Sequence, residues 1–270
     1  MSGTRGLGHP YFSGRPAPWL VAHRGGAALA PENTLAAFRR AAALGADAIE
    51  TDARLTRDGQ VVLFHDGDTA RLTGVPGTVE ARTLAEVARL DAGWAFAAGG
   101  RTFPFRGCGV GMPTLAEALE AFPGMRFNVE AKTDDPALAE ALARVVRGAG
   151  REASVCVGSA LAAQAARLRA LLPDVAAFLP VHAARCHVLA AWRGADGSRC
   201  PGGYDLAALP HRWFGLPVVT RRVLRHFAAL GVPVQAWTVD REPEMRRLVA
   251  IGVHGVMTDR PDLLARVLGR

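Results

Sequence analysis

The chain has 270 residues, half of them hydrophobic, which is enough for one large domain with a single core. Its net charge of +7 comes almost entirely from arginines in scattered short pairs, without the basic and aromatic pattern of a nucleic-acid groove. No run approaches the roughly 18 apolar residues of a membrane helix, and no apolar signal core precedes Trp19, so we expect a cytoplasmic protein without stable membrane insertion.

Short β-like runs alternate with amphipathic helical stretches along the chain. In the first half, the sequence predicts strands at 19–23, 48–52, 61–65 and 126–132, and helices at 31–44, 83–90, 114–122 and 136–149. In the second half, it predicts strands at 153–158, 175–180, 232–238 and 254–258, and helices at 160–172, 221–230, 242–250 and 261–268. The Gly- and Pro-rich region 194–219 indicates a strand only near 204–206.

About eight βα units without a Gly-x-Gly-x-x-Gly after the first strand favour a closed barrel over a doubly wound sheet. We therefore expect a TIM (β/α)8 barrel with a small insertion after the second strand. Residues 19–270 would form this single domain, residues 1–18 an N-terminal arm and residues 66–113 approximately the insertion. The part at 91–113 is rich in Gly and aromatic residues and shows little periodicity, as expected of a loop.

The four cysteines are widely spaced and include no C-x-x-C pair, so neither a zinc site nor a disulfide framework is indicated. We expect all of them to be reduced and mostly buried: Cys108, Cys156, Cys186 and Cys200.

Ionisable side chains fall at the ends of four predicted strands: His23, Glu50 with Asp52, His65, and Glu130 with Lys132. In a parallel barrel, the carboxyl ends of the strands meet on the face where active sites are built. Because side chains alternate along a strand, both residues of each pair point to the same side. Three carboxylates and a lysine should therefore converge at the barrel mouth.

Three neighbouring carboxylates repel one another, and burying an unpaired charge costs several kcal/mol. A hard divalent cation would relieve the repulsion. Oxygen ligands suit Mg²⁺ or Ca²⁺ better than zinc, which prefers His or Cys. The alternative is that the carboxylates pair with neighbouring arginines as structural salt bridges.

His23 and His65 offer a proton acceptor and a proton donor near neutral pH. One strand-end histidine is more often structural, but two beside a carboxylate cluster indicate acid–base chemistry. The other histidines receive no role: His9, His182, His187, His211, His226 and His254.

The composition is biased toward Ala, Arg and Gly, and the chain keeps one lysine, Lys132, and two asparagines, Asn33 and Asn128. Residues that survive such a bias are candidates for chemistry that Arg or Asp cannot perform. All three lie in or beside the motifs described next.

A series of short motifs spans most of the chain, from about residue 19 to 265: Val21-Ala22-His23-Arg24-Gly25-Gly26, Pro31-Glu32-Asn33-Thr34, Glu50-Thr51-Asp52, His65-Asp66, Glu130-Ala131-Lys132, Ala236-Trp237-Thr238-Val239-Asp240 and Gly255-Val256-Met257-Thr258-Asp259-Arg260-Pro261. In content and order, these motifs closely resemble the glycerophosphodiester phosphodiesterase family. That family has a TIM barrel with a small insertion after the second strand. The resemblance implies that Glu50, Asp52 and Glu130 bind a divalent cation, Mg²⁺ or Ca²⁺, and that His23 and His65 are the acid–base pair.

The resemblance also implies substrate-binding residues. Arg24 and Lys132 would contact the phosphate, the lysine as a point charge. Glu32 and Asn33 match the motif that starts the first helix, and they would fix the His23 loop as much as touch the substrate. Trp237 would be an apolar wall for the glycerol or alcohol portion of the substrate, or else a filler of the barrel core.

The implied reaction is hydrolysis of a glycerophosphodiester to glycerol 3-phosphate and an alcohol. One histidine would take the proton of the glycerol 2-hydroxyl as it attacks phosphorus, and the other would protonate the leaving alcohol, through a cyclic phosphate. We expect His23 to be the base and His65 the acid, but the sequence does not distinguish the two roles, and direct attack by water also stays open. The sequence does not distinguish Mg²⁺ from Ca²⁺, nor does it identify the alcohol or the oligomeric state.

Three other functions compete. A related barrel acting on lysophospholipid or phosphoinositide would share these residues but need a larger apolar rim. A metal-dependent amidohydrolase typically opens with a His-x-His strand, which is missing here. A non-catalytic binding barrel would be expected to have lost some of the site residues, yet all are present.

Overall fold

Parallel strands form the centre of the structure, a computed structural model that describes residues 5–97, 100 and 102–270. Eight of them in this part of the chain make up the barrel: β1 Trp19–Ala22, β2 Ala48–Leu55, β4 Arg126–Ala131, β5 Val155–Gly158, β6 Ala176–Ala177, β7 Ala207–Pro210, β10 Val234–Trp237 and β11 Gly255–Thr258. Their order is β6-β5-β4-β2-β1-β11-β10-β7. A parallel bridge between Phe178 and Leu206 joins the two ends of this order, so the predicted TIM barrel is confirmed.

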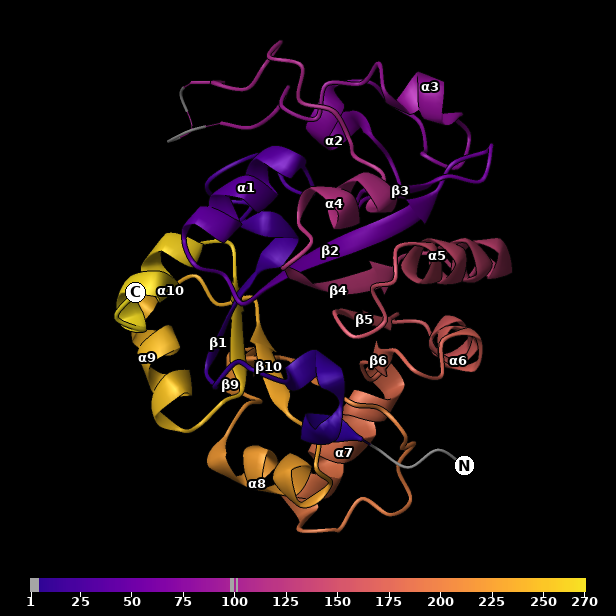
Figure 1. The fold of residues 1–270 in the computed structure, drawn as a ribbon. Helices are drawn as coiled ribbons and strands as arrows, with labels where there is room; N and C mark the ends of the chain where they lie inside the picture. Colours follow the sequence, from indigo (N-terminus) through magenta and orange to yellow (C-terminus); the bar gives the residue numbers. More distant parts are fainter. Residues whose placement is uncertain (1–4, 98–99, 101) are drawn as a thin grey trace.

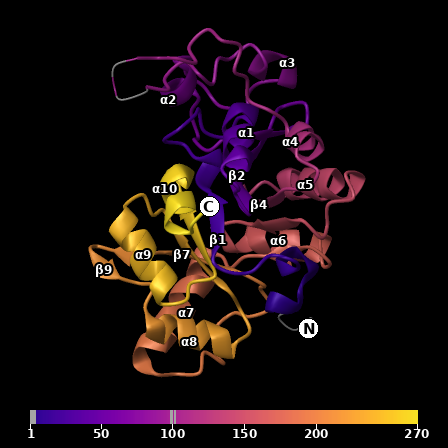
Figure 2. The same cartoon turned by 60° about the vertical axis from the view of Figure 1, so that its left-hand side comes forward.

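Helices surround the strands, as Figures 1 and 2 show. Those between barrel strands are α1 Leu35–Ala43, α4 Leu115–Ala121, α5 Pro136–Gly148, α6 Ala162–Leu171, α7 Val181–Arg193, α8 Arg221–Ala229 and α9 Glu242–Ala250, and α10 Pro261–Val267 follows β11. Several begin at a side chain that accepts a backbone N–H, as Thr34 does for α1 and Asp135 for α5. None of the helices in the described residues is long and apolar enough to cross a membrane.

Helix α7 has no counterpart among the predicted elements. Its apolar residues lie on more than one side of the helix, because Val188 faces the core while Leu189 and Trp192 are exposed. The sequence of α7 therefore lacks the single apolar stripe by which a surface helix is predicted. The strand expected near 204–206 begins one residue after that range, as β7.

The run at 61–65 is not a barrel strand, so the expectation that His65 ends a parallel strand is wrong. β3, Val61–Leu63, pairs antiparallel with the far end of β2, with Leu55 opposite Val61. The connection between the two strands is far shorter than a parallel crossover requires. The hairpin instead runs back along β2, and Phe64 N donates to Asp52 O at 2.9 Å. The antiparallel hairpin, and not a parallel barrel strand, therefore brings His65 close to Asp52.

The segment between β3 and α4 contains two short helices, α2 Ala70–Thr73 and α3 Leu84–Val87. They cover a small apolar cluster separate from the barrel core: Val62, Phe64, Leu72, Val79, Val87, Leu90, Ala92 and Met112. The proposed division into arm, barrel and insertion stays an interpretation of this arrangement.

The segment before β1 lies against the amino ends of the strands. Tyr11 is fully buried, and its hydroxyl donates to Asn128 Oδ1 at 2.6 Å. Asn128 in turn donates to Gln235 Oε1 at 2.8 Å, which links β4 with β10 inside the barrel. Asn128 thus serves packing at the end of the barrel away from the mouth, unlike the other residues retained against the compositional bias.

The expectation of four reduced, mostly buried cysteines is wrong for three of them. Cys186 in α7 and Cys200 form a disulfide with a Cα–Cα distance of 5.6 Å, and Cys108 is exposed. Only Cys156 is free and buried. Spacing alone did not reveal the pair because the loop after α7 folds back along that helix.

Reduction of the Cys186–Cys200 disulfide should lower the free energy of unfolding by about 3 kcal/mol, because the cross-link restricts the unfolded chain over a separation of 14 residues. Urea unfolding with and without dithiothreitol measures this difference. The Cys186→Ser/Cys200→Ser variant is the control, since reductant should change nothing further in it. Four reactive thiols in the unfolded, unreduced protein would contradict the pairing.

His254 should make the fold sensitive to acid. Its ring packs against Trp19 and Phe12, with centroids 4.9 and 5.4 Å away, and its buried Nε2 has no hydrogen-bond partner in the described structure. Burial lowers its pKa from 6.5 to about 4. The unfolded state therefore binds the proton more readily, so stability is complete above pH 6.5 and falls between pH 6.5 and 4, by about 3 kcal/mol.

Urea unfolding midpoints measured between pH 4 and 7 test this. His254→Phe should reduce the dependence of stability on pH, because an aromatic ring still fills the site but the titrating imidazole is gone. His182→Phe is the matched control, since His182 is exposed on α7. An unchanged acid slope in His254→Phe would assign the sensitivity to other groups.

Candidate active site

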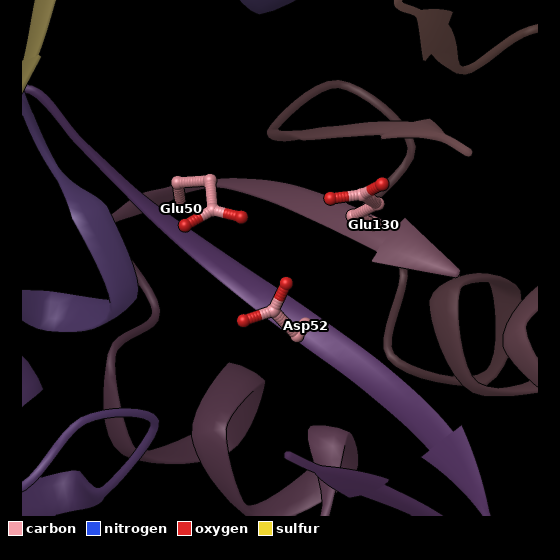
Figure 3. A group of neighbouring side chains, drawn as sticks. All are labelled: Glu50, Asp52 and Glu130. Atoms are coloured by element: carbon pink, nitrogen blue, oxygen red, sulfur yellow. The ribbon is translucent and has the colours of Figure 1, made fainter. Parts of the chain in front are cut away.

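Three carboxylates come together at the carboxyl ends of two neighbouring strands. Glu50 and Asp52 lie on β2 and Glu130 on β4, and one oxygen from each lies within 4.8 Å of the others. Figure 3 shows the three side chains facing a common space. The register explains the meeting, because Asp52 is directly opposite Glu130 and Glu50 is two residues earlier on the same face of β2. The predicted convergence at the mouth is therefore what the structure shows.

Asp52 is the most heavily paired of the three. Its Oδ1 lies 3.4 Å from Lys132 Nζ, and its Oδ2 lies 3.3 Å from Arg24 Nε. Asn33 Nδ2 also donates to Oδ2 at 2.9 Å. Burial acts to raise the pKa of Asp52, but the charges of Lys132 and Arg24 outweigh it and lower that pKa. Asp52 is thus held as a carboxylate.

Glu50 is in the opposite situation. It is 7% exposed, and the backbone N–H of Arg24 donates to its Oε2 at 3.1 Å. Its one ion-pair partner in the described residues is His23, whose Nε2 is 3.9 Å away. Burial, and next the charge of Asp52, raise the pKa of Glu50 to about 8. Glu50 therefore has no lysine or arginine side chain as an ion-pair partner in the described residues, only the more distant imidazole of His23.

Glu130 is intermediate, with Lys132 Nζ at 3.2 Å from Oε2 and the backbone N–H of Ala160 donating to Oε1 at 3.2 Å. Salt bridges to Arg or Lys side chains therefore account for Asp52 and partly for Glu130, whereas Glu50 has only the 3.9 Å contact with His23. Three carboxylates face two side-chain cations, and all the converging ligand atoms are oxygens. A hard divalent cation fits this donor set and would supply the charge that Glu50 lacks.

His23 follows β1 directly and is held by a carboxylate from the neighbouring strand. Its Nδ1 lies 2.7 Å from Oδ1 of Asp259, which follows β11. Asp259 is itself held, because its backbone N–H donates to Asp240 Oδ1 at 2.8 Å. Burial acts to lower the pKa of His23, but the hydrogen bond to Asp259 and the charge of Glu50 raise it overall. The Nε2 atom is left on the side of the acidic cluster.

His65 is held in the same way by its neighbour, with Nδ1 2.7 Å from Asp66 Oδ1. Asp66 binds Arg71, and Arg71 binds both oxygens of Glu32 at 2.7 and 3.0 Å. Glu32 then binds Arg24 at 2.8 Å. Although His65 arrives from the antiparallel hairpin, its charge is close enough to act on the pKa of Asp52.

The sequence assigned no role to Asp259 or to Arg71. Asp259 was present in the quoted Thr258-Asp259-Arg260 motif, and its position after β11, the neighbour of β1, could have indicated contact with His23. Arg71 lies in the insertion, and no local pattern connects it with the residues after β1. Its contacts with Asp66 and Glu32 can be inferred only once the β2–β3 hairpin is known to reverse the chain.

The loop after β1 is held in an uncommon conformation. Arg24 and Asn33 have φ angles of 49° and 57°, where most side chains are disfavoured and asparagine is better tolerated. Asn33 N donates to Arg24 O at 2.9 Å, and Asn33 Oδ1 accepts from Thr51 Oγ1 at 2.7 Å. Glu32 and Asn33 therefore hold Arg24 and Asp52 in place, which explains why an asparagine is needed at position 33.

Trp237 lies apart from the acidic cluster. It ends β10 and is 39% exposed, on the rim of the mouth, where it lines an apolar pocket together with Trp213. Gln235, two residues earlier, is fully buried and points into the barrel toward Asn128. The structure thus places Trp237 at the mouth and not in the barrel core.

Comparison with known proteins agrees with this arrangement. Residues 23–263 match the model of the glycerophosphoryl diester phosphodiesterase family. A Mycobacterium tuberculosis protein named probable glycerophosphodiester phosphodiesterase 2 is 35% identical, over 92% of this chain and 89% of its own length.

Two solved structures are also similar. The glycerophosphoryl diester phosphodiesterase domain of an uncharacterized M. tuberculosis protein has a TM-score of 0.83 and 25% identity, covering 94% of this chain and 99% of that domain. An Oleispira antarctica phosphodiesterase, solved with the product sn-glycerol-3-phosphate, has a TM-score of 0.76 and 26% identity, covering 94% and 97%. With its barrel and acidic mouth, this chain belongs to the glycerophosphoryl diester phosphodiesterase family and is a glycerophosphodiester phosphodiesterase.

Proposed function

We propose that the enzyme hydrolyses glycerophosphodiesters to glycerol 3-phosphate and an alcohol, with a divalent cation at Glu50, Asp52 and Glu130 and with His23 and His65 as base and acid. The observation that carries this proposal is the buried Glu50 carboxylate beside Asp52, which has no lysine or arginine partner in the described residues and lies 3.9 Å from His23 Nε2, with His65 near Asp52. The cation is Mg²⁺ or Ca²⁺ and supplies Lewis-acid stabilisation of the phosphoryl charge when it is bound.

The side chains have distinct parts in the proposed reaction. Arg24 and Lys132 lie beside Asp52 and offer their positive charges to the phosphate. Asp259 accepts from His23 Nδ1, which leaves Nε2 free to take the proton of the glycerol 2-hydroxyl. Asp66 orients His65 in the same way, so that its protonated ring donates to the leaving alcohol.

The substrate is a small molecule, and neither nucleic acid nor a membrane span has a part in the proposal. The cytoplasmic location stays a prediction. The Cys186–Cys200 disulfide weighs against it, because a reducing cytoplasm does not sustain such bonds in most proteins.

Replacement of Glu50 tests the cation. Glu50→Gln should lower kcat/KM for glycerophosphocholine by at least about 10²-fold, because loss of a ligand should cost no less than loss of a group that supports one. A coupled assay for glycerol 3-phosphate, with chelator and then with Mg²⁺ or Ca²⁺ added back, measures the effect. The matched control is Glu140→Gln, on the exposed side of α5, which should retain full activity. Activity that survives both chelation and Glu50→Gln would remove the cation from the proposal.

The 2-hydroxyl of the substrate tests the cyclic route. A 2-deoxyglycerol phosphodiester should react far more slowly than the natural diester, because it lacks the group from which His23 takes a proton. Single-turnover hydrolysis of both compounds, with release of the same alcohol, gives the comparison. Equal rates would favour direct attack by water and leave the cation and the histidines in place.

A further inference from the structure

A small two-stranded hairpin lies on the surface between β7 and α8. It consists of β8, Arg212–Trp213, and β9, Leu216–Pro217, which form a sheet separate from that of the barrel. Figure 2 shows β9 at the edge of the molecule. Trp213 lines one pocket together with Trp237, so the hairpin lies beside the barrel mouth.

The tip of this hairpin, formed by Trp213, Phe214 and Leu216, is apolar and exposed to water. Phe214 is 93% exposed, Leu216 is 66% exposed and Trp213 is 45% exposed. The rings of Trp213 and Phe214 stack on each other, with centroids 5.8 Å apart. Phe214 therefore contributes almost nothing to the packing of the fold.

The place of Phe214 in the turn is also unfavourable for folding. Phe214 and Gly215 connect the two strands, and their φ angles are 47° and 78°. Two-residue hairpin turns with positive φ at both positions favour Asn, Asp or Gly, because bulky side chains are disfavoured in the left-handed region. Gly215 meets this requirement and Phe214 does not. A residue that neither packs well nor suits its turn indicates a contact outside the fold.

Positive charge is concentrated in the part of the chain that carries the hairpin. Residues 181–250, from α7 through α9, contain ten arginines and five acidic residues, so they hold +5 of the chain's net charge of +7. Arg185 stacks over the Trp213 ring at 4.9 Å and has no carboxylate partner in the described part of the chain. Arg212 is paired with Glu244 at 2.6 Å. The apolar tip thus lies in basic surroundings.

Exposed apolar side chains on α7 enlarge this surface. Val181, Leu189 and Trp192 are each about 40% exposed, and they line the same pocket as Trp213. Together with the hairpin tip they form an apolar patch on the side of the mouth away from the carboxylates. Patches of this kind mark interaction sites on proteins that are otherwise polar at the surface.

The surface of an anionic bilayer fits this combination better than a partner protein. Aromatic rings are enriched at the level of lipid head groups, and arginines are attracted to a negatively charged leaflet. The hairpin tip is a narrow turn, whereas a stable protein interface uses about 20 to 30 residues on each side. A bilayer interface can be bound through a few apolar side chains together with basic residues.

We propose that the hairpin tip docks the enzyme onto the surface of an anionic phospholipid bilayer. Phe214, Trp213 and Leu216 enter the head-group region, and the arginines of residues 181–250 are attracted to the lipid phosphates. Docking is reversible and involves no membrane span. The inference goes beyond the proposed function, because it concerns where the enzyme binds and adds no step to the reaction.

Co-sedimentation with lipid vesicles tests the proposal. Binding to vesicles of phosphatidylcholine and phosphatidylglycerol in equal parts should exceed binding to phosphatidylcholine alone by at least about tenfold, because each arginine near the surface gains from the negative charge. Binding should weaken as sodium chloride is raised from about 0.1 to about 1 M, since the Debye length falls from about 10 to about 3 Å.

Two variants at one position separate docking from damage to the fold. Phe214→Asn places a residue that the turn favours and removes the ring, so the hairpin should persist while vesicle binding falls by at least about tenfold. Phe214→Trp should retain binding, and its added fluorescence should be quenched by lipids brominated in their acyl chains. Leu7→Asn, at an exposed leucine before β1, is the matched control and should bind as wild type does.

Three results would overturn the inference. One is wild-type protein that does not bind the anionic vesicles, or binds neutral vesicles equally well. Another is full vesicle binding by Phe214→Asn. The third is self-association without lipid that Phe214→Asn abolishes, which would assign the tip to a second copy of the chain. Turnover of glycerophosphocholine without vesicles should be equal in all variants, so a failure of docking is distinguished from a failure of the proposed function.

Discussion

The repulsion between two buried carboxylates, Glu50 and Asp52, is the constraint on which the rest of the mouth depends. They lie two residues apart on one face of β2, and the barrel removes water from around both. Asp52 is stabilised by Arg24, Lys132 and Asn33, which explains why the loop after β1 is kept in a left-handed conformation. That arrangement places the Arg24 and Lys132 side chains beside Asp52 and leaves Glu50 with only the 3.9 Å contact to His23. The same contacts that stabilise the fold therefore leave a cluster of carboxylate oxygens whose chemistry is compatible with a divalent cation.

Much of this site could be predicted from strand periodicity. Alternation along a strand places Glu50 and Asp52 on one face, and a parallel barrel brings β2 and β4 together at their carboxyl ends, so Glu130 joins them. The survival of Lys132 against the compositional bias also has a physical reason, because its ammonium bridges two of the three carboxylates. These conclusions need only the local period and the rule that parallel strands share an edge.

What could not be predicted depends on contacts between distant segments. His65 was expected at the mouth for the wrong reason, since a reversing hairpin, and not a barrel strand, brings it there. The Arg71 bridge between Asp66 and Glu32 requires that same reversal. The disulfide of Cys186 with Cys200 requires that the loop after α7 fold back, and α7 itself was hidden because its apolar residues serve two surfaces at once.

Helix α7 packs one apolar side against the core and exposes another near the mouth. This explains how one barrel mouth can have two chemical environments. Charge is concentrated over β1, β2 and β4, where His23 and the carboxylates lie, whereas the side formed by β7, β10 and α7 is lined by Trp237 and its apolar neighbours. A low-dielectric wall strengthens nearby electrostatic interactions, since it replaces water that would otherwise screen them. A group that covers the exposed ring of Trp237 would exclude water from this side of the mouth.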